Sequence, residues 1–281
     1  MAISAFAQPP AISPNGDKNS SYAYGLVEKM FESCTEVKAM YCEVDKRERF
    51  DGKYVEAQSK IKMTCDPYCV YLKQLGNSGD AEILYRKDFN EGKVLVNPNG
   101  FPWFNLSLDP YGSLIRKNQH HLILDIGFSK FNTVLAHLLE KYRGEADEFV
   151  QYKNEEVISG RLCHVVDIEN DNYQLIEYRT QPGETTMGIS DRLKISEYRI
   201  VELNEEVDGY GELEAGMKLT IPNDYAPRIR LFIDQERFIP MRFEVYDDQG
   251  ELFEAYQYDN VILNVNFSKE ELTEDYPEYG F

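Results

Sequence analysis

The sequence predicts an α+β fold in which antiparallel strands dominate, and three observations support this prediction. Aromatic residues make up 13% of the chain, with 20 Tyr and 15 Phe, and aromatic side chains favour strands. Short apolar segments are separated by turn sequences such as Asp51-Gly52, whose residues tolerate positive φ and favour a tight hairpin. One long apolar stripe at helical spacing runs from Phe128 to Tyr142.

A first helix is predicted from about Tyr24 to Ala39, because its apolar residues share one face. These are Val27, Met30, Phe31, Cys34 and Val37. Strands follow, with turns at Asn90-Glu91-Gly92 and Asn97-Pro98-Asn99-Gly100. We expect these strands at residues 40–50, 54–63, 70–75, 81–86 and 94–97.

The clearest helix is predicted from Ser129 to Tyr142, with Gly144 as its stop. Its stripe is typical of core packing rather than of a ligand site, and consists of Phe128, Phe131, Val134, Leu135, Leu138, Leu139 and Tyr142. Further strands are expected at residues 149–153, 161–168, 228–234, 241–246, 252–258 and 261–265. In one of them Ile229, Leu231 and Ile233 alternate with Arg228, Arg230 and Phe232, as in a strand with one apolar face.

Composition narrows the partners of this chain. The 281 residues, 42% of them hydrophobic, are enough for one large core or two smaller ones. The net charge of −19 makes nucleic acid and anionic lipid headgroups poor partners. No apolar run approaches the ~18 residues of a membrane span. Ala5-Phe6-Ala7 fits a signal cleavage site with Gln8 as the first mature residue, although the charged and long apolar parts of a signal are missing.

Cysteine and histidine usage predicts neither a metal site nor a cofactor. The five Cys are an odd number, and Cys65 and Cys69 flank a turn where they are able to pair in an oxidising compartment. We favour buried or idle thiols. The four His residues do not supply the spacing of a zinc site, and His120-His121 is predicted to have a surface or turn role at the start of a strand.

The stretch from Leu175 to Ala226 carries the most specific pattern in the chain. Its positions are Tyr178, Pro182-Gly183-Glu184-Thr185, Ile189, Leu193, Ile200, Leu203-Asn204, Leu213, Gly216 and Lys218-Leu219-Thr220-Ile221-Pro222. They closely resemble a LysM domain, the small βααβ module that binds N-acetylglucosamine-containing glycans. The resemblance implies a carbohydrate-binding module, with peptidoglycan as the expected glycan.

In LysM domains the glycan groove lies between the loop after the first strand and the loop before the second. Carried over by position, the glycan-binding residues expected here are Gly183, Glu184, Thr185, Thr186, Met187, Asn204, Glu205, Glu206 and Val207. Thr185 also suits the N-cap of the following helix. Thr186 stands where the family usually has an apolar residue, and Glu205 where Pro is common, so both departures put glycan affinity in doubt.

The flanking segments resemble an uncharacterised bacterial secreted domain family related to LolA-like lipoprotein carriers. The residues that carry this resemblance are 46–52, 67–73, 83–85, 231–234, 239–242 and 256–261. It implies a strongly curved antiparallel half-barrel, with helices against its concave side. Such a sheet either holds acyl chains or closes on its helices without a cavity, and the sequence leaves both open.

We therefore predict a signal remnant and flexible leader (residues 1–21), a half-barrel domain in two parts (22–172 and 227–281), and an inserted LysM-like domain (173–226). Insertion at a hairpin tip is tolerated because the loop ends already lie close together. The sequence contains no G-x-S-x-G, H-E-x-x-H or P-loop motif, so we expect no enzyme.

The favoured function is a non-catalytic protein of the periplasm or cell envelope that binds peptidoglycan. The alternatives are a periplasmic carrier of a lipid or lipoprotein acyl chain, and a scaffolding component that contacts an envelope protein.

Overall fold

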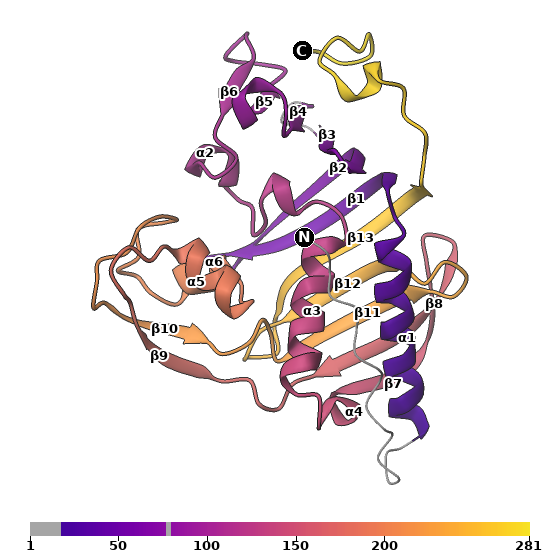
Figure 1. Cartoon of the computed structure of the whole chain (residues 1–281), viewed down its shortest axis with the longest axis vertical. Helices are drawn as coiled ribbons and strands as arrows, with labels where there is room; N and C mark the ends of the chain where they lie inside the picture. The colour runs from indigo at the N-terminus through magenta and orange to yellow at the C-terminus, as the bar shows by residue number, and fades with distance from the viewer. Residues whose placement is uncertain (1–17, 77–79) are drawn as a thin grey trace.

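The computed structural model describes residues 18–76 and 80–281, and its centre is one large curved antiparallel sheet that does not close into a barrel (Figure 1). The sheet has 11 strands in the order β6-β5-β4-β3-β2-β1-β13-β12-β11-β8-β7. Strands β9 and β10 form a separate two-stranded sheet. This architecture confirms the predicted α+β class.

The strands before the LysM-like segment are β1 (Ala39–Phe50), β2 (Lys53–Cys65), β3 (Tyr68–Leu75), β4 (Glu82–Arg86), β5 (Val94–Asn97), β6 (Leu106–Leu108), β7 (Val150–Ile158) and β8 (Arg161–Glu169). Those within and after it are β9 (Leu175–Arg179), β10 (Lys218–Pro222), β11 (Arg228–Asp234), β12 (Pro240–Tyr246) and β13 (Leu252–Leu263). The chain leaves the sheet after β8 and returns as β11, which pairs with β8. The backbone N–H of Asn170 donates to the carbonyl of Pro227 at 2.7 Å and closes this return.

The helices are α1 (Lys18–Thr35), α2 (Ser113–Arg116), α3 (Ser129–Lys141), α4 (Ala146–Phe149), α5 (Thr186–Leu193) and α6 (Glu197–Glu202), with short 3₁₀ turns at η1 (Asn90–Gly92), η2 (Ile123–Asp125) and η3 (Glu270–Leu272). In Figure 1, α1 and α3 lie across one face of the sheet. Within the described part of the chain, no helix is both long and apolar enough to cross a bilayer.

The main core lies between the sheet and helices α1 and α3. Met30 from α1 and Leu135 from α3 are fully buried, as are Leu231 and Ile233 on β11. Phe131 stacks on Phe243 of β12 with ring centroids 4.0 Å apart. These side chains contact one another directly, so the helices close on this part of the sheet.

Buried ion pairs join strands β8 and β11 near the β7 edge of the sheet. Asp167, 1% exposed, accepts two hydrogen bonds from Arg230 at 2.7 and 2.8 Å. Asp234, fully buried, accepts from Arg161 at 2.6 Å. Arg161 and Arg237 and nearby backbone N–H groups hold the pKa of Asp234 well below its usual range, although burial alone would raise it.

The structure corrects several predicted boundaries. The expected signal remnant lies outside the described residues, whereas residues 18–21, assigned to the leader, begin α1. The two last predicted strands are one strand, β13, in which Asn260 adopts a positive φ of 50°. Phe232 is buried although it lies on the same face as Arg228 and Arg230, and the Arg242 guanidinium lies over its ring at 5.5 Å from the centroid.

We expect Leu135→Ala to lower the free energy of unfolding by about 2–5 kcal/mol, because it opens a void in a closed core. Urea unfolding at neutral pH measures the change. Leu114→Ala, at a side chain 63% exposed, is the control and should shift stability by less than about 0.5 kcal/mol. A cost below about 1 kcal/mol for Leu135→Ala would instead indicate a space between α3 and the sheet.

Candidate functional site

The LysM-like unit folds around a core of its own. Strand β9 pairs antiparallel with β10, and α5 and α6 lie between them in the chain. Its buried residues form a cluster separate from the main core, namely Ile189, Ile195, Ile200, Val207, Leu213, Leu219 and Ile221. Thr185 caps α5 by accepting from the backbone N–H of Gly188 at 2.9 Å, and Ser196 caps α6 in the same way. The expected N-cap role of Thr185 is confirmed.

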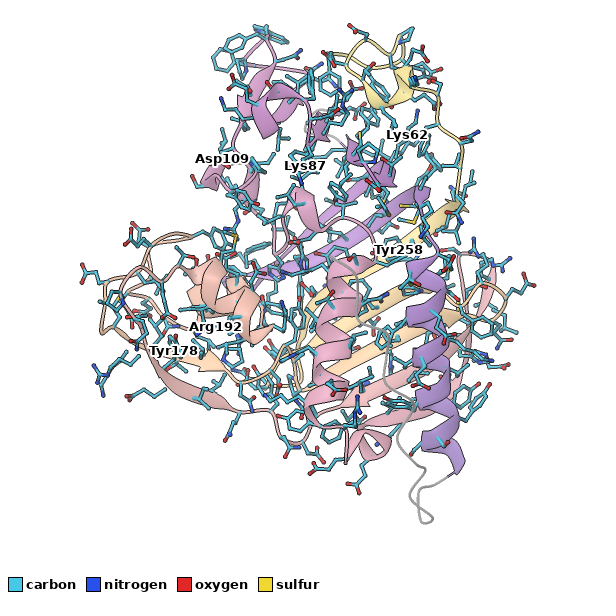
Figure 2. All side chains as sticks on the ribbon, in the orientation of Figure 1. Lys62, Lys87, Asp109, Tyr178, Arg192 and Tyr258 are labelled. Carbon is cyan, nitrogen blue, oxygen red and sulfur yellow. The ribbon has the colours of Figure 1, made fainter. Side chains whose placement is uncertain are left out.

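The first predicted loop is partly open to solvent. Gly183 is exposed with a φ of 76°, a conformation that favours glycine. Glu184 accepts from Tyr178 Oη at 2.6 Å and from Arg192 Nη2 at 2.7 Å, and Figure 2 shows Tyr178 and Arg192 side by side. Burial opposes ionisation of Glu184, but the hydrogen bond from Tyr178, a backbone N–H and the Arg192 charge together lower its pKa. The negative charge of Glu184 is therefore compensated locally.

The second predicted loop divides into structural and exposed residues. Asn204 is 3% exposed and its amide donates to the carbonyls of Ile200 and Thr220 at 2.6 and 2.8 Å. Val207 belongs to the core of the unit. Glu205 and Glu206 face solvent. In this loop the two glutamates carry the exposed side chains.

The first loop contacts a different part of the second connection than the sequence suggested. The N–H of Thr186 donates to Gly211 O at 3.1 Å, and the N–H of Leu213 donates to Glu184 O at 2.9 Å. Thr185 and Glu212 form an isolated bridge. Sequence reasoning included Leu213 in the LysM pattern but did not place residues 209–212 beside the first loop.

Thr186 is fully buried, and its own contacts are to Glu197 and Gly211 of the LysM-like unit. Its hydroxyl donates to Glu197 Oε1 at 2.6 Å, and Glu197 pairs with Arg116 of α2 at 2.5 Å. The Arg116 guanidinium lies 3.4 Å from the ring centroid of Tyr210. The hydroxyl at this position, where the family usually has an apolar side chain, therefore takes part in a polar contact between the two parts of the chain.

A second polar cluster joins the parts around Glu254, which is fully buried on β13. One carboxylate oxygen accepts from Tyr225 Oη at 2.7 Å. The other lies 2.9 Å from His120 Nδ1 and 3.1 Å from His121 Nε2. Tyr198 of α6 stacks on His120, with centroids 4.7 Å apart. A surface or turn role was predicted for His120 at the start of a strand. His120 does lie in a bend, but the surface role was wrong because residues far apart in the sequence bury it, and the 3₁₀ turn η2 follows instead of a strand.

Glu48, His120 and Glu254 offer ligand atoms within 4.8 Å of one another, a donor set that fits a divalent metal. His120 Nε2 lies 2.9 Å from the carbonyl of Arg49, which is the outer contact typical of metal-ligating histidines. However, Lys46 Nζ already lies 2.8 Å from Glu48 Oε2, although that oxygen receives no well-directed hydrogen bond. With Lys46 and His121 supplying positive charge, the two carboxylates are balanced by the chain itself.

A cavity of about 250 Å³ lies beside this cluster, between the LysM-like unit and the half-barrel. His121, Tyr225 and Asp125 line it together with Lys130 of α3 and Met187 of α5. Met187, predicted to contact glycan, thus faces the half-barrel. Lys130 pairs with Asp191 of α5 at 2.7 Å across the same contact.

The electrostatics of the cluster make stability depend on pH. Burial alone would lower the pKa of His121, but the charge and hydrogen bond of Glu254 outweigh it and raise the pKa to about 9. The pKa of the unfolded histidine is about 6.5. Because the pKa of His121 is higher in the folded state, its protonation stabilises the folded state fully at pH values below the unfolded pKa. This stabilisation is lost as pH rises through about 9.

We expect the free energy of unfolding to fall between about pH 6.5 and 9 by an amount on the order of 3 kcal/mol. Glu254→Gln should weaken this dependence and lower the pKa of His121, because the burial effect is then opposed by the charges of Asp125 and Glu48 alone. Urea unfolding across this range and NMR titration of His121 measure both. Glu155→Gln, next to His164 on the other side of the sheet, should leave the dependence intact. An unchanged pH profile in Glu254→Gln would contradict this assignment.

Comparison with known proteins identifies two families. The model of the family described as Protein of unknown function (DUF1571) matches residues 37–180, just over half of the chain. The LysM domain model matches residues 178–222, which confirms the LysM resemblance. No curated protein matches the sequence. The DUF1571 match ends before β11, so the proposed assignment of residues 227–281 to the same domain remains a prediction.

Solved structures with similar folds have low sequence identity. A DUF1329 family protein from Desulfovibrio piger is 10% identical, with 92% of this chain and 98% of that chain covered and a TM-score of 0.36. The Mycobacterium tuberculosis lipoprotein LppX is 10% identical, with 88% of this chain and 99% of that chain covered and a TM-score of 0.41. A putative outer membrane lipoprotein-sorting protein domain from Vibrio parahaemolyticus is 7% identical, with 92% of this chain and 98% of that chain covered and a TM-score of 0.30. On the strength of its match over residues 37–180, this chain belongs to the DUF1571 family, and it carries a LysM domain at residues 178–222.

Proposed function

We propose that this chain is a non-catalytic protein of the cell envelope that binds N-acetylglucosamine-containing glycan, foremost peptidoglycan, through its LysM domain. The observation that carries the proposal is the coincidence of the LysM match at residues 178–222 with a complete βααβ unit that has its own core. Location in the periplasm, or secretion to the envelope, is part of the proposal.

The glycan contacts that we propose use the exposed parts of the two predicted loops. Gly183, Glu205 and Glu206 are open to solvent, and Glu184 and Thr185 are partly open. Thr186, Asn204 and Val207 are buried, so their part is to hold the loop backbones in place. Backbone N–H and C=O groups of such loops suit the N-acetyl groups of a polar glycan chain.

The half-barrel, in this proposal, serves as a support rather than as a lipid carrier. Its core residues pack directly between the sheet and α1 and α3. A hollow of about 420 Å³ over β1, β2, β12 and β13 is lined mostly by polar and charged side chains, including Asp45, Arg47 and Arg242. Pockets for apolar ligands have predominantly apolar linings. Neither the packed core nor this polar hollow therefore suits an acyl chain.

We expect the purified chain to co-sediment with peptidoglycan sacculi, and Glu205→Gln/Glu206→Gln to strengthen binding about two- to fivefold at low salt. The reason is that peptidoglycan stems carry carboxylates, which repel the exposed carboxylates of Glu205 and Glu206. Within the described part of the chain neither glutamate forms an ion pair, whereas Glu184 pairs with Arg192. The fraction of protein pelleted against sacculus concentration measures the effect.

Glu155→Gln/Glu156→Gln on strand β7 is the matched control, because it removes the same charge from exposed positions outside the LysM domain. Its binding should equal that of the parent chain. Soluble N-acetylglucosamine oligomers should displace the protein from sacculi. An intact, folded chain that stays in the supernatant would refute the proposal, and a gain in the control variant equal to that of the loop variant would refute the position of the site.

A further inference from the structure

Three adjacent aromatic side chains stand out from the surface in the loop between β5 and β6. Phe101 is 86% exposed, Trp103 83% and Phe104 66%. Figure 1 shows β5 and β6 at the upper end of the molecule, away from helices α1 and α4. We call Phe101, Trp103 and Phe104 the aromatic tip.

The aromatic tip rests on an ordered base. Val94 and Val96 of β5 are buried in a small core with Ile83 and Tyr85, against which Leu106 and Leu108 of β6 pack. Below the tip, the Asn99 amide donates to the carbonyl of Asp80, and the Asn97 amide donates to that of Gly280 in the C-terminal segment. The neighbouring apolar residues therefore pack in a small core, whereas the three aromatic rings lie outside it.

The sequence around the tip is free of charge. No Asp, Glu, Lys or Arg occurs from Val94 to Leu108, in a chain in which 28% of residues are charged. The nearest charges along the chain are Lys93 and Asp109, the latter visible in Figure 2. Moving a charged side chain into an apolar phase is costly, and this segment has none to move. Aromatic rings, and Trp above all, are enriched where hydrocarbon meets the polar headgroups of a bilayer.

We propose that the aromatic tip inserts into the headgroup boundary of a lipid bilayer whose zwitterionic headgroups carry no net charge. The headgroup class follows from charge, because a protein of net charge −19 is repelled by an anionic surface. The bilayer follows from shape, because rings that are 66–86% exposed project outward, whereas small-molecule sites are concave. The tip would hold this end of the half-barrel at a membrane surface, independently of glycan binding by the LysM domain.

Trp103 is the only tryptophan of the chain, so its fluorescence reports on the tip directly. We expect the full chain mixed with phosphatidylcholine vesicles to show a blue-shifted emission and reduced quenching by acrylamide. Phe101→Ser/Phe104→Ser keeps the reporter and should weaken vesicle partitioning at least about tenfold, because it removes two apolar rings from the contact.

Val157→Ser/Leu162→Ser is the matched control, since these side chains are 66% and 45% exposed at the β7–β8 edge of the sheet. It should bind vesicles like the parent chain, and circular dichroism verifies that both variants fold. Vesicles of phosphatidylglycerol should bind more weakly than phosphatidylcholine. Equal or stronger binding to them would overturn the headgroup assignment.

Three results would overturn the membrane assignment itself. One is an unchanged Trp103 spectrum with phosphatidylcholine vesicles. Another is a shift that appears with N-acetylglucosamine oligomers but not with vesicles, which would make the tip a sugar platform. The third is equal partitioning of Phe101→Ser/Phe104→Ser and the parent chain.

Discussion

The carboxylate of Glu254 is the contact on which the arrangement of this molecule depends. It lies on a central strand of the large sheet and binds Tyr225 at the exit of the LysM domain together with two histidines of the α2–α3 connection. Isolated buried charges are costly, and breaking a buried pair is more costly than never having made one. Of these three donors only Tyr225 comes from the exit of the LysM domain, while Tyr198 of the same domain stacks on His120. Through these two tyrosines the buried cluster holds the LysM domain against the half-barrel.

The point where the chain enters and leaves the LysM domain is held by a second carboxylate. Asp224 is 3% exposed and binds Lys141 and Tyr142 at the end of α3, and the Asn170 amide at the end of β8. Because α3 also packs its apolar stripe on the sheet, the core and the connection stabilise each other. The LysM domain is thus attached to a closed scaffold through buried hydrogen bonds rather than through a free linker.

The two surfaces with proposed functions lie on separate elements of this scaffold. The glycan loops belong to β9–α5 and α6–β10, whereas the aromatic tip belongs to the β5–β6 connection. The exposed loop residues Gly183, Glu205 and Glu206 and the aromatic tip lie outside the main core, so these positions are free to contact a partner without loss of packing.

The sequence by itself determined the α+β class, the hairpins and the core stripe of α3, because periodicity and turn chemistry are local properties of the chain. The LysM domain was identified from the resemblance of its residue pattern to that family. The sequence assigned Thr185 correctly as a cap, but the choice of glycan contacts placed buried Thr186, Asn204 and Val207 beside exposed Glu205 and Glu206. Only the tertiary structure decided which of these is covered, and that His120, Glu48 and Glu254 meet. These three residues are more than 70 residues apart along the chain, so no local sequence pattern predicts that they meet. The burial of this cluster is set by the docking of two folded parts.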